Sequence, residues 1–238
     1  MQDGGFGVLG VLETGRPPED LAPAFGDYPG MVGDWLAPLG AAVRPYAVLD
    51  GEFPDSPAEC DLWVITGSRF GVYEGHDWIP PLEEFIRICH DRKRPMVGIC
   101  FGHQIIAQAL GGVVRKSAKG WGLGVHDYTP VNWPAALGRA PERIALQSWH
   151  QDQVEELPDE AWRIATSEFC ENAALWYPGF ALTFQGHPEF PADYVRALID
   201  LRRGTTISQE TAEEGLRNLA REANPDLLPA LIATAFSN

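Results

Sequence analysis

Residues 94–112 read RPMVGICFGHQIIAQALGG, and this stretch decides the fold of the chain. The segment 95–99 is short, apolar and bounded by polar residues, which predicts a buried β-strand. Over 102–110 the apolar side chains recur at helical spacing and two glycines follow, which predicts a helix and its end. Cys100 therefore lies at the turn between a strand and a helix.

Cys100 has the sequence surroundings of a nucleophile. Gly98 and Gly102 lie two residues to either side of it, which is the spacing of the elbow that carries the catalytic serine of many hydrolases. Such a turn holds the nucleophile in a cramped backbone conformation, so its neighbours must lack side chains. The N-terminus of the following helix favours the reactive thiolate, and the N–H of Phe101 is placed to stabilise an oxyanion. The alternative is a buried structural cysteine, but the flanking strand and helix favour the nucleophile.

The remaining sequence predicts the fold class. Up to residue 112, strands are expected at 7–13, 43–49, 61–66 and 95–99, with helices at 31–39, 77–92 and 102–110. Alternation of this kind implies parallel strands joined by right-handed crossovers. Short antiparallel strands follow at 113–115, 122–128, 143–149, 162–166 and 173–177, then a buried strand at 180–185 and helices at 191–203 and 208–236.

These elements predict an α/β fold with a central, mostly parallel sheet, flanking helices and added short antiparallel strands. The sequence contains no repeat, low-complexity tract or linker. We therefore expect a single domain over residues 1–238, with a helical C-terminal extension from about residue 204.

Composition narrows the function classes. The formal net charge of −15 argues against binding to nucleic acid and to anionic membranes. No apolar run approaches the roughly 18 residues that span a bilayer, and the first residues lack the basic start of a signal peptide. The four cysteines are widely spaced without a C-x-x-C pair, as in reduced cytosolic proteins. We expect a cytoplasmic protein with no metal and no cofactor.

A second motif, GHPEF at residues 186–190, follows the predicted strand 180–185. A histidine at the carboxyl end of a strand lies in the crevice where open α/β sheets bind ligands, at the edge that Cys100 also reaches. Glu189 is close enough in sequence to His187 to hold its imidazole through the second nitrogen. The three side chains form a predicted triad of nucleophile, base and orienting carboxylate. Taken alone, His187 could instead be a turn histidine beside a proline.

The two motifs together, GICFGHQ at 98–104 and GHPE at 186–189, resemble the class I glutamine amidotransferase family, with its flavodoxin-like fold. The resemblance extends from residue 7 to about residue 203. Segments similar to the γ-glutamyl peptidase branch are DGEFP at 50–54, ITGS at 65–68 and HQD at 150–152. The amidotransferase domain of GMP synthase is similar but more distant. The resemblance implies attack of the Cys100 thiolate on a γ-carbonyl, a γ-glutamyl thioester and its hydrolysis by water.

The resemblance also implies an oxyanion hole. In the family, the loop after the third strand supplies a second N–H beside that of Phe101, which here points to Gly67 and Ser68. Many amidotransferases have a glycine-rich GGP-like loop, whereas residues 66–70 read TGSRF. Which of the two amides donates therefore stays open.

Four further residues are implied to bind substrate. Gln104 resembles the family glutamine that helps to hold the amino-acid end of the substrate. Residues 148–152, SWHQD, resemble the S-H-x-D loop that also grips this end, through His150 and Asp152. Trp149 lies within this loop and is expected to line the pocket, with a place in the core as the alternative. A surface turn is the alternative for this loop.

Three functions remain open. The first is a glutaminase-type hydrolase that hands ammonia to a synthetase; no synthetase fits within 238 residues, so its partner would be a separate acceptor subunit. The second is a stand-alone γ-glutamyl peptidase, which the branch-like segments favour. The third is a non-catalytic regulatory subunit, against which the intact triad argues. Both enzymes would hydrolyse a γ-glutamyl C–N bond, with glutamine or another γ-glutamyl small molecule as substrate.

Overall fold

A computed structural model describes residues 5–236 of the chain. Within these residues the strands form a nine-stranded sheet and a two-stranded sheet. The large sheet contains, in spatial order, β2 (Ala42–Tyr46), β1 (Val8–Leu12), β3 (Leu62–Ile65), β4 (Met96–Ile99), β11 (Ala181–Phe184), β10 (Ala174–Tyr177), β9 (Trp162–Thr166), β6 (Gly122–Pro130) and β7 (Ile144–His150). The small sheet pairs β5 (Val113–Lys116) with β8 (Asp152–Glu156).

The large sheet has a parallel half and an antiparallel half. Strands β2, β1, β3, β4 and β11 pair in parallel, and β10, β9, β6 and β7 continue the sheet in antiparallel fashion. Strands β3, β4 and β11 are buried along their whole length, which explains their continuous apolar sequences. The predicted α/β fold, with a largely parallel centre and added antiparallel strands, is confirmed.

Helices cover both faces of the parallel strands. Helices α3 (Ile79–Asp91) and α4 (Phe101–Ala109) share one core with Trp63 and Ile65 of β3. Helices α2 (Tyr28–Trp35) and α7 (Leu228–Phe236) share the opposite core with Leu62 and Val64 of the same strand. Successive β3 side chains therefore enter different cores, as the two-residue period of a strand requires.

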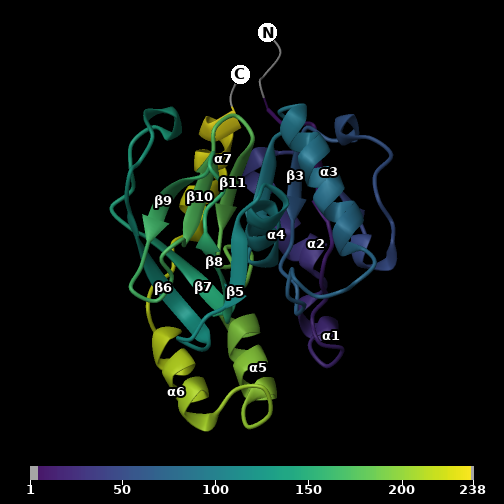
Figure 1. The fold of residues 1–238 in the computed structure, drawn as a ribbon. Coiled ribbons are helices and arrows are strands. Elements are labelled where there is room, and N and C mark those ends of the chain that lie inside the picture. Colours follow the sequence, from purple (N-terminus) through teal and green to yellow (C-terminus); the bar gives the residue numbers. More distant parts are fainter. Residues whose placement is uncertain (1–4, 237–238) are drawn as a thin grey trace.

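A third group of helices lies at the carboxyl ends of the parallel strands. Helices α1 (Ala22–Phe25), α5 (Ala192–Arg202) and α6 (Gln209–Asn218) occupy the lower end of the molecule in Figure 1. Phe190 and Tyr194 pack there against Tyr28 of α2. This cluster closes one side of the sheet edge to which the sequence motifs lead. Across residues 5–236, every helix is too short or too polar to cross a membrane.

Two helical segments differ from expectation. The helix predicted over 31–39 begins earlier, since the Asp27 carboxylate accepts the N–H of Gly30 and caps α2. It ends at Trp35, and a 3₁₀ turn, Ala37–Leu39, follows. The segment predicted as helical over 208–236 contains two helices, α6 and α7, and a 3₁₀ turn, Pro225–Leu227, lies between them.

Candidate active site

Cys100 occupies a strained turn between β4 and α4. Its φ of 51° and ψ of −100° are unusual for a residue with a side chain. A Cβ on Gly98 would lie 2.7 Å from the carbonyl group of Gly102, and a Cβ on Gly102 would lie 2.4 Å from the carbonyl oxygen of Ile65. Both glycines are therefore needed for α4 to approach the sheet so closely.

The sulfur of Cys100 reaches the cleft floor, although the residue is only 5% exposed. Its backbone N–H donates to the Phe184 carbonyl at 2.9 Å, which ties the elbow to β11. Its Sγ lies 4.0 Å from the carbonyl oxygen of Trp149. The N–H of Phe101, at the start of α4, has no acceptor among the described residues. An unpaired N–H at this position can donate to an anion beside the sulfur.

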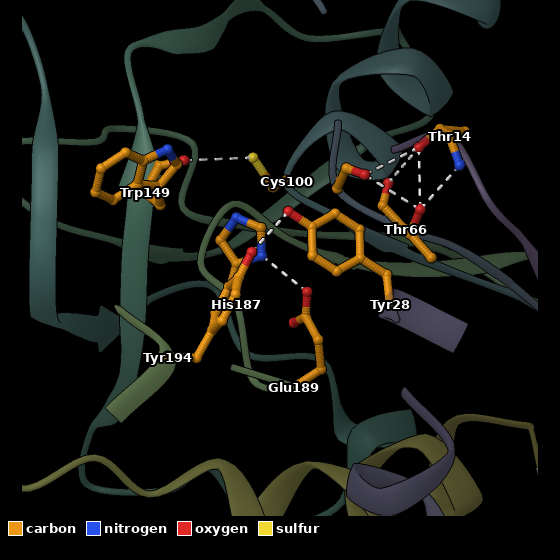
Figure 2. A network of polar contacts seen from close by, with 9 residues as sticks. Thr14, Tyr28, Thr66, Cys100, Trp149, His187, Glu189 and Tyr194 are labelled. Atoms are coloured by element: carbon orange, nitrogen blue, oxygen red, sulfur yellow. Dashed lines mark hydrogen bonds and ion pairs between the residues drawn. The ribbon is translucent and has the colours of Figure 1, made fainter. Parts of the chain in front are cut away.

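His187 lies between Cys100 and Glu189, as Figure 2 shows. Its backbone N–H donates to the Gln147 carbonyl at 2.7 Å, just beyond the end of β11. Its Nδ1 donates to Oε1 of Glu189 at 2.8 Å, and its ring stacks on Phe190 with centroids 4.0 Å apart. Nε2 is buried and has no hydrogen-bond partner in residues 5–236. The imidazole is thus fixed in position and leaves one nitrogen for chemistry.

The charge balance at His187 favours the imidazolium. Burial alone would lower the pKa of its side chain, but the Glu189 carboxylate and the ionised Cys100 sulfur raise this pKa to about 10. A proton on His187 would stabilise a thiolate on Cys100 through the same interaction. His187 can therefore carry a positive charge beside the Cys100 sulfur at neutral pH.

Gly67 and Ser68 lie beside these groups, at the end of β3. A Cβ on Gly67 would meet Cε1 of His187 at 2.7 Å and Cβ of Cys100 at 3.7 Å, so only glycine allows this approach. The hydroxyl of Ser68 donates to the Thr14 carbonyl at 2.6 Å and anchors the loop to the end of β1. The loop predicted to supply an oxyanion N–H therefore lies against Cys100 and His187.

The cleft above Cys100 has a volume of about 1010 Å³. The four residues expected to bind substrate line this cleft: Gln104, Trp149, His150 and Asp152. The Gln104 side-chain amide donates to the Asp152 carbonyl at 2.8 Å and to the Gln185 side chain at 3.1 Å. The Asp152 carboxylate accepts from Tyr73 at 2.8 Å. The structure thus brings the two predicted substrate segments together on one wall.

His150 differs from a surface-turn residue. It is buried at the end of β7, and its Nδ1 donates to the Asp152 carbonyl at 3.1 Å. Burial lowers its pKa to about 3, so the side chain is neutral at pH 7. It can therefore shape the bend that leads to β8, but it cannot attract a carboxylate as a cation would.

Sequence reasoning missed several polar residues around the site. The hydroxyl of Tyr28, in the cleft wall, pairs with that of Tyr194 at 3.1 Å. Thr14 and Thr66, the first residue of the loop after β3, are fully buried, and their hydroxyls lie 3.1 Å apart. The only sequence signal for Thr14 is its place directly after an apolar strand. Among residues 5–236, no group of three or more His, Cys, Asp or Glu side chains could hold a metal.

Comparison with known proteins shows the family of the chain. The profile of the family "Glutamine amidotransferase class-I" matches residues 58–194. The chain belongs to the class I glutamine amidotransferase family.

Individual relatives extend the likeness over most of the chain. It is 31% identical over 188 residues to γ-glutamyl peptidase 5 of Arabidopsis thaliana, which covers 76% of this chain and 75% of that protein. It is 33% identical over 118 residues to a glutamine-hydrolysing GMP synthase subunit of Methanospirillum hungatei, covering 45% and 60%. The crystal structure of a glutamine amidotransferase from Thermotoga maritima aligns with a TM-score of 0.75 and 25% identity, covering 97% of this chain and 99% of that one.

Proposed function

We propose that the protein is a cysteine hydrolase that cleaves a γ-glutamyl C–N bond through a γ-glutamyl thioester on Cys100. His187 is the general base and acid, and Glu189 orients it. The observation that carries this proposal is the alignment of the three groups, with Nδ1 of His187 2.8 Å from Glu189 and Nε2 free on the side of Cys100.

Each step of the reaction has a group to perform it. The Cys100 thiolate attacks the γ-carbonyl carbon, a C–S bond forms and the carbonyl electron pair moves to oxygen. This oxyanion is held by the Phe101 N–H and by an amide of the loop after β3. The His187 imidazolium gives its proton to the leaving nitrogen, and the C–N bond breaks. Neutral His187 then takes a proton from water, which attacks the thioester and releases Cys100 and the γ-carboxylate.

We favour a γ-glutamyl peptide over free glutamine as the acyl donor. A cleft of about 1010 Å³ is at the upper end for drug-sized ligands and larger than one amino acid requires. Gln104 and Asp152 line the wall assigned to the amino-acid end, whereas Tyr28, Phe190 and Arg202 line the cleft from other elements. Arg202 has no ion-pair partner within the described chain and could receive the carboxylate of a peptide leaving group. The relatives named γ-glutamyl peptidase support the same choice.

An ammonia-supplying subunit is the second candidate, since one relative is named as part of a glutamine-hydrolysing GMP synthase. Glutamine would then be the substrate, and a separate acceptor subunit would be the partner. A non-catalytic regulatory role is less well supported, because Cys100, His187 and Glu189 are all present and brought together.

Steady-state kinetics on the purified chain test the proposal. We expect hydrolysis of at least one γ-glutamyl dipeptide or γ-glutamyl amide with a higher kcat/KM than glutamine, and no turnover by Cys100→Ala. Negligible rates on the whole panel, followed by glutamine hydrolysis when a partner from cell extract is added, would favour the ammonia-supplying role. Turnover that persists in Cys100→Ala would contradict the mechanism itself.

A further inference from the structure

The loop after β3 is held by three hydroxyl groups, those of Thr14, Thr66 and Ser68. Figure 2 shows Thr14 and Thr66 in contact with each other. The Thr14 hydroxyl lies 2.9 Å from the Thr66 carbonyl oxygen and 3.2 Å from that of Gly67. The Thr66 hydroxyl accepts the Thr14 N–H at 3.0 Å and lies 3.1 Å from the Gly67 carbonyl oxygen. The Ser68 hydroxyl donates to the Thr14 carbonyl. All polar groups of Thr14 are therefore engaged with residues 66–68.

The number of protons in this network matches the number of carbonyls. The Thr14 and Thr66 hydroxyls supply two protons, and the carbonyls of Thr66 and Gly67 are the two backbone acceptors beside them. Both threonine side chains are fully buried, so water does not replace a lost donor from the surface. Loss of either hydroxyl would leave a buried carbonyl without its donor, which is costly in a site of low dielectric.

The fixed carbonyl also fixes the next amide. A trans peptide is planar, so the N–H of Ser68 points opposite to the carbonyl of Gly67. That carbonyl faces the end of β1, where a Cβ on Gly15 would meet its oxygen at 2.7 Å. The Cα of Gly67, in contrast, faces His187 and Cys100. No acceptor for the Ser68 N–H occurs in residues 5–236.

We propose that Thr14 and Thr66 are positioning residues that hold the Gly67–Ser68 peptide with its N–H toward Cys100. Ser68 and Phe101 then supply the two N–H groups of an oxyanion hole that is complete in the isolated chain. The inference rests on the proposed function and deepens it, because a site assembled without a partner is the site of a stand-alone hydrolase. It also accounts for TGS in place of a glycine-rich loop, since the Ser68 hydroxyl is part of the anchor.

The alternative is that these bonds only join β1 to β3. A purely structural link would change stability without changing the balance between kcat and KM. Thr14→Val keeps the shape and removes one hydroxyl, and Thr14→Ser keeps the hydroxyl and removes a methyl. Thr183→Val is a matched control, because Thr183 is equally buried but bonds to His103 and not to the loop.

Kinetics on a γ-glutamyl anilide give the first readout. We expect Thr14→Val to lower kcat on the order of tenfold to a hundredfold with little change in KM, since the N–H acts on the transition state. Binding of glutamate γ-semialdehyde, whose carbonyl carbon is attacked by the Cys100 thiolate to leave an oxyanion, should weaken by the same factor. Thr14→Ser and Thr183→Val should keep the wild-type values.

Alkylation by iodoacetamide gives the second readout. This displacement at carbon needs the thiolate but no oxyanion hole, so its rate at Cys100 should be unchanged in Thr14→Val. Equal losses in alkylation and in kcat would show general damage to the Cys100–His187 pair and would overturn the proposal. Wild-type kcat in Thr14→Val would also overturn it.

A crystal structure of Thr14→Val separates this inference from the proposed function. We expect the Gly67–Ser68 peptide to be turned, or split between two orientations, while Thr14→Ser keeps the wild-type orientation. If the wild type hydrolyses no γ-glutamyl substrate, the proposed function fails, but this comparison still tests the positioning role. An unchanged peptide in Thr14→Val would contradict that role whatever the substrate.

Discussion

The imidazole of His187 and the carboxylate of Glu189 meet at 2.8 Å in a region that solvent barely reaches, with the two residues 3% and 5% exposed. The pair lies two residues apart in sequence, on a turn directly after β11. The stacked ring of Phe190 covers the imidazole from one face. The base therefore has one orientation, and its free nitrogen is aimed at Cys100 by the backbone and by packing together.

Cys100→Ala should abolish turnover and leave the fold intact, because the sulfur forms the covalent bond and little packing depends on it. A chloro-dihydroisoxazole amino acid should label Cys100 alone. Burial raises the pKa of the other three thiols, to about 12 for Cys89 and Cys170, so they stay protonated. Peptide mapping after labelling checks this. An adduct at Cys60, Cys89 or Cys170 instead would rule out the assignment.

His187→Asn should lower kcat by roughly 10³-fold or more, since both thiol deprotonation and proton donation to the leaving nitrogen fail. Glu189→Gln should lose less, about 10- to 100-fold, because orientation weakens while nucleophile and base remain. Single-turnover rates distinguish the two variants, and circular dichroism checks that both keep the wild-type fold. A Glu189→Gln variant as inactive as His187→Asn, with an unchanged fold, would require a more direct role for Glu189.

His187 should also make stability depend on pH. Its pKa is about 10 in the folded chain and about 6.5 when unfolded. The folded state therefore holds the extra proton between these values, so this stabilisation is complete below about pH 6.5 and is lost as the pH rises through 10. Urea unfolding across this range should show wild type losing more stability than His187→Asn. Parallel curves for the two proteins would contradict a raised pKa.

Gly67→Ala should reduce activity by about a hundredfold, because its Cβ would overlap Cε1 of His187 and displace the base. Gly75→Ala is the matched control, since Gly75 lies in the same connection and has open space around its Cα. Kinetics on both variants and their melting temperatures test the contact. Full activity in Gly67→Ala would mean that the loop does not press on His187 in solution.

Arg202→Gln should raise KM for γ-glutamyl dipeptides and leave KM for uncharged γ-glutamyl amides unchanged, if the guanidinium receives the leaving-group carboxylate. Arg203→Gln is the neighbouring control, because Arg203 pairs with Asp200 at 3.1 Å and does not line the cleft. The test is to measure KM for dipeptides and for amides with both variants. Equal effects on dipeptides and amides would place the carboxylate elsewhere.

Much of the site could be predicted because short motifs follow the ends of buried strands. Cys100 follows β4 and His187 follows β11, and these neighbouring parallel strands bring their carboxyl ends to one edge. Once both segments are predicted as strands, proximity follows from topology alone. Glu189 could be predicted as the partner of His187 from its position two residues further along the chain.

The parts of the fold and the site that could not be predicted depend on contacts between residues far apart in sequence. Strand β8 carries the polar sequence DQVEE and forms because β5 lies beside it, so a tertiary partner outweighs a weak propensity. Thr14 and Thr66 are 52 residues apart, and their hydroxyls meet only because β1 and β3 are adjacent. No sequence pattern distinguishes a threonine with such a contact from other threonines that follow a strand.

Strand β2 gives the large sheet an edge with built-in protection against aggregation. Its residues are mostly exposed, so another strand could in principle pair with it. Pro45 interrupts such pairing, because proline has no backbone N–H to donate to a neighbouring strand. Arg44 adds a charge on the same short strand, and its guanidinium pairs with Glu59 at 3.8 Å. A second molecule that tried to extend the sheet here would meet an interrupted ladder and a charge that it would have to cover. This edge should therefore resist fibril-like growth during expression and concentration.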